Sequence, residues 1–330
     1  MEKIKNIEIS NFKSIKHLKI EGCNKINVFI GQPNAGKSNI LEALGLYGMT
    51  VSNKPNLNDF VRFRNASELF FEGNITDKIE IEINKSLLTL IEKDYSNESD
   101  FDPNDYINFS ASNDLKVKRE IYKSESNGVK SVKKYQFRDV EFEVQNNQKN
   151  LDFPLGKNLA QVIISNPKIR NRVNELFREN DLKLLIDKGN NELKIFKEYQ
   201  DGVVFILSYE LIADTLQRLI FYKAAIMSNE KSILLFEEPE AHCFEPYILE
   251  FTNDVKYDKN DNQFFIVTHS DFIIQEFLRD EESKQNTNIY LVNNVDGETK
   301  VKFLDKKKND DVYEYGMNAF FNFESLWENN

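Results

Sequence analysis

The sequence predicts an α/β protein built around a mixed β-sheet. Three runs dominated by apolar residues support this prediction: Ile26–Ile30, Ser232–Phe236 and Gln263–Thr268. Runs of this kind, without a strict alternation, are typical of strands in a parallel sheet that is covered on both faces. In such open sheets, ligands bind at the carboxyl ends of the strands. The residues that follow these three runs are therefore the first candidates for function.

The first run leads into residues 31–38, which read Gly-Gln-Pro-Asn-Ala-Gly-Lys-Ser and fit the phosphate-binding pattern G-x-x-x-x-G-K-[ST]. In this P-loop, glycines let the backbone wrap so that N–H groups point at a phosphate, and the following helix adds the positive end of its dipole. Lys37 is expected to reach the β- and γ-phosphates, and Ser38 to ligate Mg²⁺. The loop residues predicted to bind the nucleotide are Gly31, Asn34, Ala35, Gly36, Lys37, Ser38 and Asn39.

Two carboxylates, Glu237 and Glu238, stand at the carboxyl end of the second run. Glu237 is placed to hold the Mg²⁺ shell beside Ser38, and Glu238 to polarise the water that attacks the γ-phosphate. Adjacent carboxylates repel, so we expect one of them to have a raised pKa that suits a general base. His269 ends the third run, where a neutral imidazole can hydrogen-bond the γ-phosphate or the attacking water. The predicted catalytic residues are Lys37, Glu238 and His269, and the predicted metal residues are Ser38 and Glu237.

The rest of the chain divides by pattern into three predicted parts. Residues 1–84 begin the core, residues 85–200 interrupt it as an inserted lobe, and residues 201–330 complete it. In the first part, strands are predicted at Ile4–Ile9, His17–Glu21, Glu68–Glu72 and Lys78–Asn84, and the P-loop helix is predicted to end near Met49.

The predicted lobe begins with a hairpin and continues with helices. The hairpin pairs Leu115–Tyr122 with Val132–Val144 around a turn at Asn127 and Gly128, and the helices are Lys157–Ser165 and Pro167–Arg178. In the last part, the pattern predicts a strand at Val203–Leu207, a helix over about Glu210–Ser228, and a hairpin of Ile289–Asn293 with Lys300–Leu304.

Composition sets limits on partners. The chain has 330 residues, 40% hydrophobic and 29% charged, with a net charge of −11, which argues against a broad cationic coat for nucleic acid. Residues 116–138 are a local exception, with eight basic residues against two acidic ones. This segment is either the solvated face of a hairpin or a contact for DNA, RNA or an acidic partner. No apolar run reaches the roughly 20 residues that span a bilayer, so we expect a cytoplasmic protein without a membrane partner.

The order of these features resembles a known group of proteins. Asn11-Phe12-Lys13-Ser14 follows a first strand, and then come the P-loop, a distant apolar run ending in Glu-Glu-Pro-Glu, and Thr-His-Ser. This order resembles the ABC-type ATPases of the RecF, SMC and OLD group. More narrowly, it is similar to the small bacterial AAA-type ATPases that accompany phage-defence effectors. The resemblance covers residues 1–50 and about 200–293.

The resemblance implies an ABC-type P-loop ATPase head with a mixed β-sheet, an N-terminal antiparallel β-subdomain and an inserted lobe. It implies ATP and Mg²⁺ as cofactors, with Lys13 beside the adenine base. It also implies that two heads close on two ATP molecules, each site being completed by the partner's signature segment. Here that segment is Ala213–Arg218, with Asp214 and Thr215 as nucleotide contacts, although Ala213 and Thr215 replace the usual Ser and Gly.

Two further positions depart from the pattern of the group. Glu237 stands where most relatives carry Asp. The loop that joins the core to the lobe in relatives carries a glutamine, for which Asn65 and Asn74 are the candidates here. Hydrolysis of ATP is therefore expected to be slow, and the cycle to act as a conformational switch.

The resemblance implies a sensor ATPase that governs a separate effector, a nuclease or toxin, in bacterial anti-phage defence. A RecF-like DNA-repair ATPase that binds DNA is the alternative, and a transporter subunit fits less well because it would carry a clear glutamine loop and a Gly-rich signature. The aromatic tail could dock the effector or pack onto its own head; it comprises Tyr313, Tyr315, Phe320, Phe321, Phe323 and Trp327.

Overall fold

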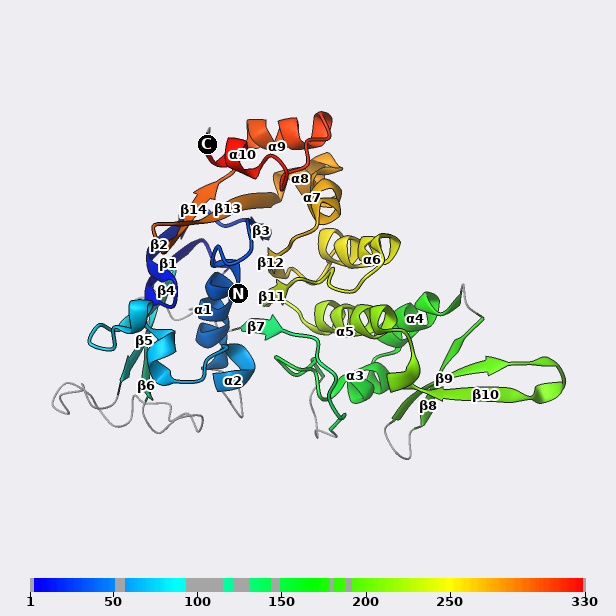
Figure 1. The fold of residues 1–330 in the computed structure, drawn as a ribbon. Helices are drawn as coiled ribbons and strands as arrows, with labels where there is room; N and C mark the ends of the chain where they lie inside the picture. Colours follow the sequence, from blue (N-terminus) through cyan, green and yellow to red (C-terminus); the bar gives the residue numbers. More distant parts are fainter. Residues whose placement is uncertain are drawn as a thin grey trace. The chain divides into compact units, whose positions relative to one another are not determined.

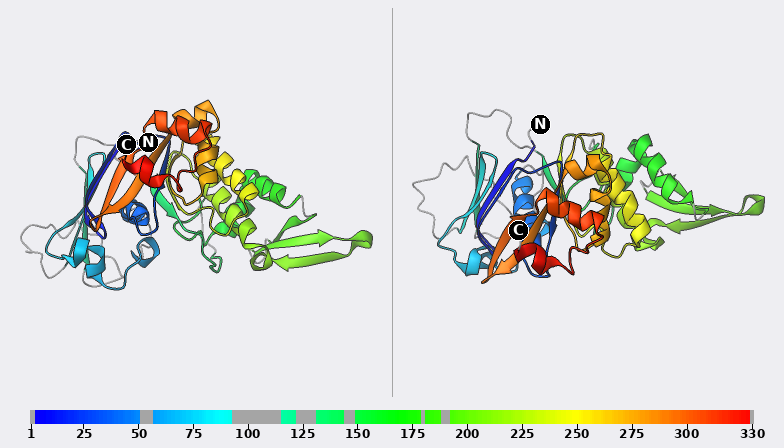
Figure 2. Two further views of the ribbon diagram at one scale, coloured as in Figure 1. Left: turned by 45° about the horizontal axis from the view of Figure 1, so that its top comes forward. Right: turned by 90° about the horizontal axis from the view of Figure 1, so that it is seen from above.

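The computed structural model describes residues 3–50, 57–92, 115–121, 131–143, 149–178, 181–187 and 192–328. The chain forms two compact units (Figures 1 and 2). The core unit comprises Met1–Lys134, Lys231–Glu238 and Gln263–Asn330, and the lobe unit comprises Tyr135–Glu230 and Pro239–Asn262.

A six-stranded mixed sheet forms the centre of the core unit, in the order β14-β13-β3-β12-β11-β7. The central strands β3, β11, β12 and β13 run parallel, and β14 pairs antiparallel with β13. The predicted buried runs and the predicted late hairpin are therefore confirmed. The strands are β3 (Ile26–Ile30), β7 (Val132–Tyr135), β11 (Ile233–Glu237), β12 (Gln263–Val267), β13 (Thr287–Val295) and β14 (Glu298–Phe303).

A second, antiparallel sheet belongs to the core unit, in the order β2-β1-β4-β5-β6. Isoleucines alternate with charged residues in β4, and Ile79, Ile81 and Ile83 are fully buried. The helix α1 (Lys37–Met49) contacts β1 and β4 of this sheet and β11 and β12 of the other, so it lies between the two (Figure 2). The strands are β1 (Asn6–Phe12), β2 (Ile15–Glu21), β4 (Ile79–Ile83), β5 (Ser86–Glu92) and β6 (Leu115–Ile121).

Two predictions for the core unit are wrong. The predicted hairpin does not form, because β6 pairs with β5 in one sheet while β7 belongs to the other; the expected turn at Asn127 and Gly128 lies outside the described residues. The predicted strand at Glu68–Glu72 is a pair of 3₁₀ turns, Ala66–Leu69 and Phe71–Gly73, next to the short helix α2 (Leu57–Phe60). Alternation of residues predicts a strand but does not name its pairing partner.

The lobe unit combines four helices with a three-stranded antiparallel sheet in the order β10-β9-β8. The central helix α5 (Asp214–Ser228) contacts α3 (Leu159–Ser165), α4 (Pro167–Leu176) and α6 (Glu245–Lys256). Both predicted helices are confirmed, and Asn166 caps α4 by accepting from the backbone N–H groups of Lys168 and Ile169. The strands are β8 (Lys183–Asp187), β9 (Glu192–Glu198) and β10 (Val204–Ser208), of which only β10 was predicted.

The observed units differ from the predicted division at 84 and 200. Strands β5 and β6 extend the antiparallel sheet of the core unit, although they fall after residue 84. Conversely, α5 and α6 fall after residue 200 but belong to the lobe unit, where α5 packs against α3, α4 and α6. Each unit thus groups elements that pack against one another although they are distant in the sequence, and the order of the residues alone does not show this packing.

The remaining helices belong to the core unit. They are α7 (Asp271–Leu278), α8 (Glu281–Gln285), α9 (Lys306–Glu314) and α10 (Phe323–Glu328). Within the described residues, none of the helices combines the length and the apolar character needed to cross a membrane.

Candidate nucleotide-binding site

The P-loop connects β3 to α1 in the core unit, as predicted. Asn34 and Gly36 have positive φ angles of 61° and 97°, and α1 begins at Lys37. A Cβ atom on Gly36 would lie 1.9 Å from Oγ1 of Thr299, and one on Gly31 would lie 2.0 Å from the carbonyl oxygen of Val292. Glycine is therefore required at both positions, because β13 and β14 approach the loop backbone closely.

Lys37 lies inside this loop. Its side chain is buried, and Nζ donates hydrogen bonds to the carbonyl oxygens of Gly31 (2.9 Å) and Gln32 (2.8 Å). The loop backbone thus holds the ammonium group where an anion would be bound.

Asn39 has a structural partner that the sequence did not predict. Its Nδ2 donates to Oγ of Ser14 (2.7 Å), and Ser14 in turn shares a hydrogen bond with Oγ1 of Thr299 (2.6 Å). The first turn of α1 is therefore tied to the turn between β1 and β2 and to β14. This arrangement connects the P-loop to both sheets of the core unit.

Glu237 lies at the carboxyl end of β11 and contacts several polar groups. Burial favours the protonated form of its carboxyl group, but Lys134, the Ser38 hydroxyl and Arg62 outweigh burial and hold the pKa of Glu237 below the ordinary carboxyl range. The expectation of a raised pKa in the pair is therefore not met at Glu237. The contact with Ser38 places the two predicted metal residues together.

Glu238 and His269 follow β11 and β12, which are neighbours in the sheet. Nε2 of His269 lies 3.6 Å from Oε1 of Glu238. Burial and the positive charge of Lys37 lower the pKa of His269 below its ordinary value, while Glu238 opposes the shift. The imidazole is thus neutral at pH 7, where it can donate from one nitrogen and accept at the other.

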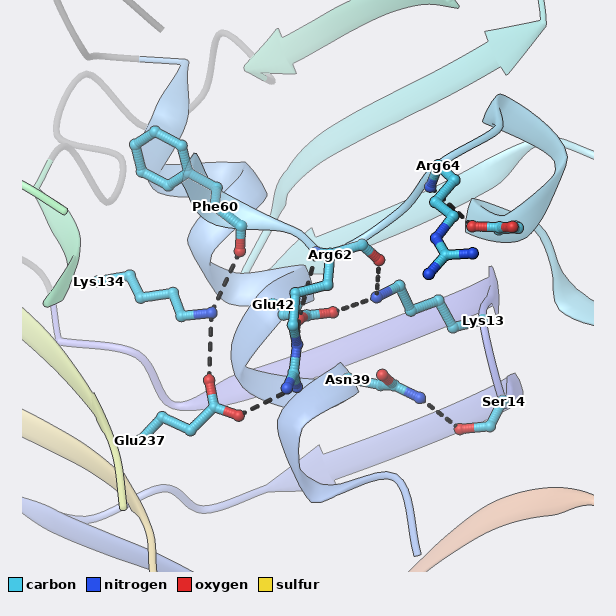
Figure 3. Close-up of polar contacts among 10 residues, drawn as sticks. Lys13, Ser14, Asn39, Glu42, Phe60, Arg62, Arg64, Lys134 and Glu237 are labelled. Carbon is cyan, nitrogen blue, oxygen red and sulfur yellow. Dashed lines mark hydrogen bonds and ion pairs between the residues drawn. The ribbon is translucent and has the colours of Figure 1, made fainter. Parts of the chain in front are cut away.

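A chain of charged side chains reaches Glu237 from the N-terminal sheet (Figure 3). The fully buried Glu42 of α1 accepts from Nζ of Lys13 and from Nε of Arg62 (2.9 Å). Arg62 also donates to Oε1 of Glu237 (3.2 Å), and Nζ of Lys134 lies 3.3 Å from Oε2 of the same residue. Sequence reasoning missed Glu42, Arg62 and Lys134. The sequence did carry a signal for this network: Glu42 is a single carboxylate within an apolar helix pattern, and a buried carboxylate needs a charged partner.

Lys13 and Lys134 have contacts that bear on two predictions. Nζ of Lys13 also donates to the carbonyl oxygen of Arg62 (2.8 Å), so its ammonium group is held between Glu42 and this carbonyl; its expected place beside adenine stays a prediction. Lys134 was counted in the basic segment 116–138, but its side chain is buried and donates to the carbonyl oxygen of Phe60 (3.2 Å). Part of that segment lies outside the described residues.

The donor set fits a Mg²⁺ ion only with help from the nucleotide and water. Ser38 and Glu237 supply a hydroxyl and a carboxylate, which are the oxygen ligands that Mg²⁺ prefers. Among the described residues, no group of three His, Cys, Asp or Glu side chains is arranged to hold a metal ion. A site of one or two protein oxygens completed by phosphate and water is usual for this ion.

The signature-like residues belong to the lobe unit and are engaged there. Asp214 starts α5 and pairs with Nε of Arg218 (2.7 Å), while Oγ1 of Thr215 donates to the carbonyl oxygen of His242 (2.9 Å). Ala213, at the N-cap of α5, provides no side-chain cap. Thr215 thus stands at the position of the usual signature glycine, and its hydroxyl is already hydrogen-bonded to the carbonyl oxygen of His242.

A glutamine also lies near the point where the chain first passes from the core unit to the lobe unit. The chain passes from the core unit to the lobe unit after Lys134, and Gln136 follows at once, with Oε1 accepting from Arg138 (3.0 Å). The two earlier candidates, Asn65 and Asn74, both lie within the core unit and not at the junction. Which residue takes the place of the relatives' glutamine therefore stays a prediction.

The fold and the site define a class. A P-loop and two further strand ends meet at one edge of a mixed sheet, and the same unit holds an antiparallel sheet. The chain belongs to the family described as AAA ATPase domain, whose model matches residues 3–201.

Solved SMC heads share the fold. The chain is similar to the SmcHead bound to the C-winged helix domain of ScpA, with a TM-score of 0.54 and 16% identity over 93% of this chain and 99% of that one. It is also similar to the Smc head domain from Pyrococcus furiosus bound to the C-terminal domain of ScpA, with a TM-score of 0.52 and 14% identity over 96% and 99% of the two chains. At these identities the likeness shows the fold alone.

Curated relatives match over short stretches. The chain is 56% identical over 41 residues to the ATP/GTP phosphatase of Helicobacter pylori, which is 12% of this chain and 11% of that protein. It is 40% identical over 52 residues to the DNA replication and repair protein RecF of Lactococcus lactis subsp. cremoris, which is 16% of this chain and 14% of RecF. The matches thus span about a tenth to a seventh of these relatives' lengths.

Proposed function

We propose that this protein binds ATP with Mg²⁺ and hydrolyses it to ADP and phosphate. The observation that carries the proposal is the meeting of Lys37, Ser38, Glu237 and the Glu238–His269 pair at the carboxyl ends of β3, β11 and β12. Strand ends at a switch point of a sheet are where such sheets bind ligands. Membership of the AAA ATPase domain family supports the same proposal.

Each residue has a role that follows from its chemistry. Lys37 exchanges its carbonyl partners in the loop for the β- and γ-phosphate oxygens. Ser38 and Glu237 would hold Mg²⁺, which would supply positive charge to offset that of the phosphates. Glu238 accepts a proton from the attacking water, and the neutral His269 orients that water or the γ-phosphate. Lys134 and Arg62 compete with Mg²⁺ for Glu237, which is consistent with slow turnover.

Glu238→Gln tests this proposal. The amide keeps the size of the side chain but cannot accept the proton, so the ATPase rate falls by about 10² to 10⁴ while binding of a fluorescent ATP analogue persists. Lys37→Ala is the control that loses binding. Equal, near-zero rates of phosphate release for wild type and Glu238→Gln would refute hydrolysis.

We also propose that ATP brings two copies together and that the dimer regulates a separate effector, a nuclease or toxin, in bacterial anti-phage defence. The signature-like start of α5 supports dimerisation, and an exposed apolar edge strand supports a protein partner. This strand, β10, exposes Val204, Phe205 and Ile206 by 47–52%, and it pairs only with β9 within the described residues.

Sedimentation of Glu238→Gln with and without ATP tests the dimer, and co-purification with a neighbouring gene product tests the effector. If the protein sediments as a monomer with and without ATP, the proposed ATP-dependent dimer is contradicted.

A RecF-like role in DNA repair is the second candidate, because the chain is 40% identical over 52 residues to the DNA replication and repair protein RecF. This role predicts DNA affinity that falls steeply with salt. A fluorescence-anisotropy titration with duplex DNA at two salt concentrations separates the two functions.

A further inference from the structure

The C-terminal strap, defined here as Asn318–Glu328, is anchored on the core unit. It consists of a turn followed by α10, which lies beside β14 (Figure 1). Ala319, Phe323 and Leu326 are buried. Nζ of Lys302 on β14 donates to the carbonyl oxygen of Trp327 (2.7 Å) and lies 4.7 Å from the centre of its ring. The strap is therefore a packed part of the fold, which agrees with the expectation that the aromatic tail can pack onto its own head.

The strap contacts the candidate catalytic histidine. The ring of Phe320 stacks on the imidazole of His269, with centroids 6.2 Å apart and planes inclined by 24°. Beside this pair, the backbone N–H of Ala319 donates to Oδ1 of Asp271, two residues after His269 (2.9 Å). Asn318 accepts from the N–H groups of Phe320 and Phe321 (both 3.0 Å), which fixes the turn that presents Phe320.

The strap also contacts the P-loop. Nε2 of Gln32 donates to Oε1 of Glu324 on α10 (2.8 Å), and the carbonyl oxygen of the same Gln32 accepts from Nζ of Lys37. The strap thus makes two contacts at the site: Glu324 contacts Gln32, which binds Lys37, and Phe320 contacts the ring of His269. Because the Gln32–Glu324 bond is exposed, it adds little free energy by itself.

We infer that Phe320 is a positioning residue for His269, holding the imidazole so that Nε2 faces Glu238. This inference rests on the proposed ATPase function of the site. The ring of His269 is bounded by Phe320 on one face, and the charges of Glu238 and Lys37 act on it. An imidazole without the stacking ring would rotate among its rotamers and would spend less time in the orientation that meets the γ-phosphate or the attacking water.

Phe321 provides a matched control within the same turn. Its side chain is 92% exposed, whereas Phe320 is packed against His269. Phe320→Ala and Phe321→Ala remove the same group from neighbouring positions. Phe320→Tyr keeps the stacking ring and serves as the conservative rescue.

The first measurement is the ATPase rate. We expect Phe320→Ala to lower kcat by about two- to tenfold, the equivalent of one aromatic pair, with the KM for ATP unchanged. We expect Phe321→Ala and Phe320→Tyr to match the wild type. Equal kcat values for Phe320→Ala and Phe321→Ala would overturn the inference.

The second measurement does not depend on hydrolysis. The chain has three histidines, and His269→Asn identifies the ring-proton signals of His269 in an NMR spectrum of the nucleotide-free protein. We expect a ring-current shift that disappears in Phe320→Ala, and in Phe320→Leu if the alanine variant does not fold. An unchanged His269 signal in both variants refutes positioning by Phe320. A lost shift combined with a wild type that has no ATPase activity upholds the contact while refuting the proposed function.

Discussion

Two buried lysines, one in each unit, have opposite electrostatic settings. Lys134 in the core unit and Lys223 in the lobe unit are both 3% exposed at the side chain. Lys223 donates to Asp254 (2.6 Å) and Glu250 (3.3 Å), so a single ammonium serves two carboxylates. Lys134 instead shares Glu237 with Arg62, so a single carboxylate is served by two cations.

The pKa values of the carboxyl groups follow this difference. Burial raises the pKa of Asp254, with a smaller contribution from the charge of Glu250, and together they outweigh the opposing effect of the Lys223 ammonium. Burial also acts on Glu237, but Lys134, Ser38 and Arg62 together lower its pKa. An excess of cations near the P-loop suits a polyphosphate, whereas the excess of carboxylates in the lobe has the character of a structural ion pair.

The largest expected effect comes from breaking the core network at Glu42. Glu42→Gln removes the only carboxylate paired with Lys13 in the described residues and leaves Arg62 with Glu237 alone, so we expect a loss of about 3 kcal/mol in unfolding free energy. Asp254→Asn, the matched lobe variant, is expected to cost about 1 kcal/mol, because Lys223 retains Glu250. Urea unfolding followed by circular dichroism measures both. Equal losses would contradict the comparison.

A smaller effect is expected on the metal requirement. Lys134→Met removes a cation that competes with Mg²⁺ for Glu237, so the Mg²⁺ concentration for half-maximal ATPase activity is expected to fall by about three- to tenfold. Lys223→Met alters a lysine of equal burial in the lobe and is expected to leave this concentration unchanged. A rise in the required Mg²⁺ in Lys134→Met would show that Lys134 supports the site and does not compete.

The smallest expected effect is on the pH dependence of folding stability, to which Glu237 in the core unit and Asp254 in the lobe unit contribute with opposite signs. Glu237 has a lowered pKa, so its contribution to stability is present above the ordinary carboxyl pKa and is lost as the pH falls through its folded pKa. Asp254 has a raised pKa, so the folded state binds its proton more tightly, and stability increases as the pH falls through that value.

Thermal unfolding from pH 7 down to well below the ordinary carboxyl pKa checks these signs, because the loss at Glu237 occurs below that value. We expect Asp254→Asn to remove the gain in stability on acidification and Glu237→Gln to remove the loss. A wild-type profile identical to that of Asp254→Asn would contradict the assignment to the lobe.

Local patterns predicted most of the sheet and the residues at its strand ends. Glycines 31 and 36 of the P-loop, the run before Glu237 and the run before His269 are contiguous in sequence, so their geometry follows from strand, loop and helix propensities. The predicted hairpin of Leu115–Tyr122 failed for the complementary reason: its two strands pair with partners distant in sequence, β5 and β11.

The sequence alone therefore determined the P-loop, the two carboxylates and the histidine, together with a mixed α/β sheet. The tertiary structure decided which charges surround Glu237, that the core unit passes to the lobe unit after Lys134, and that Phe320 stacks on His269. The physical reason is that a local pattern specifies the conformation of its own segment. The partner of a buried charge or ring is set by packing between segments that lie far apart in the chain.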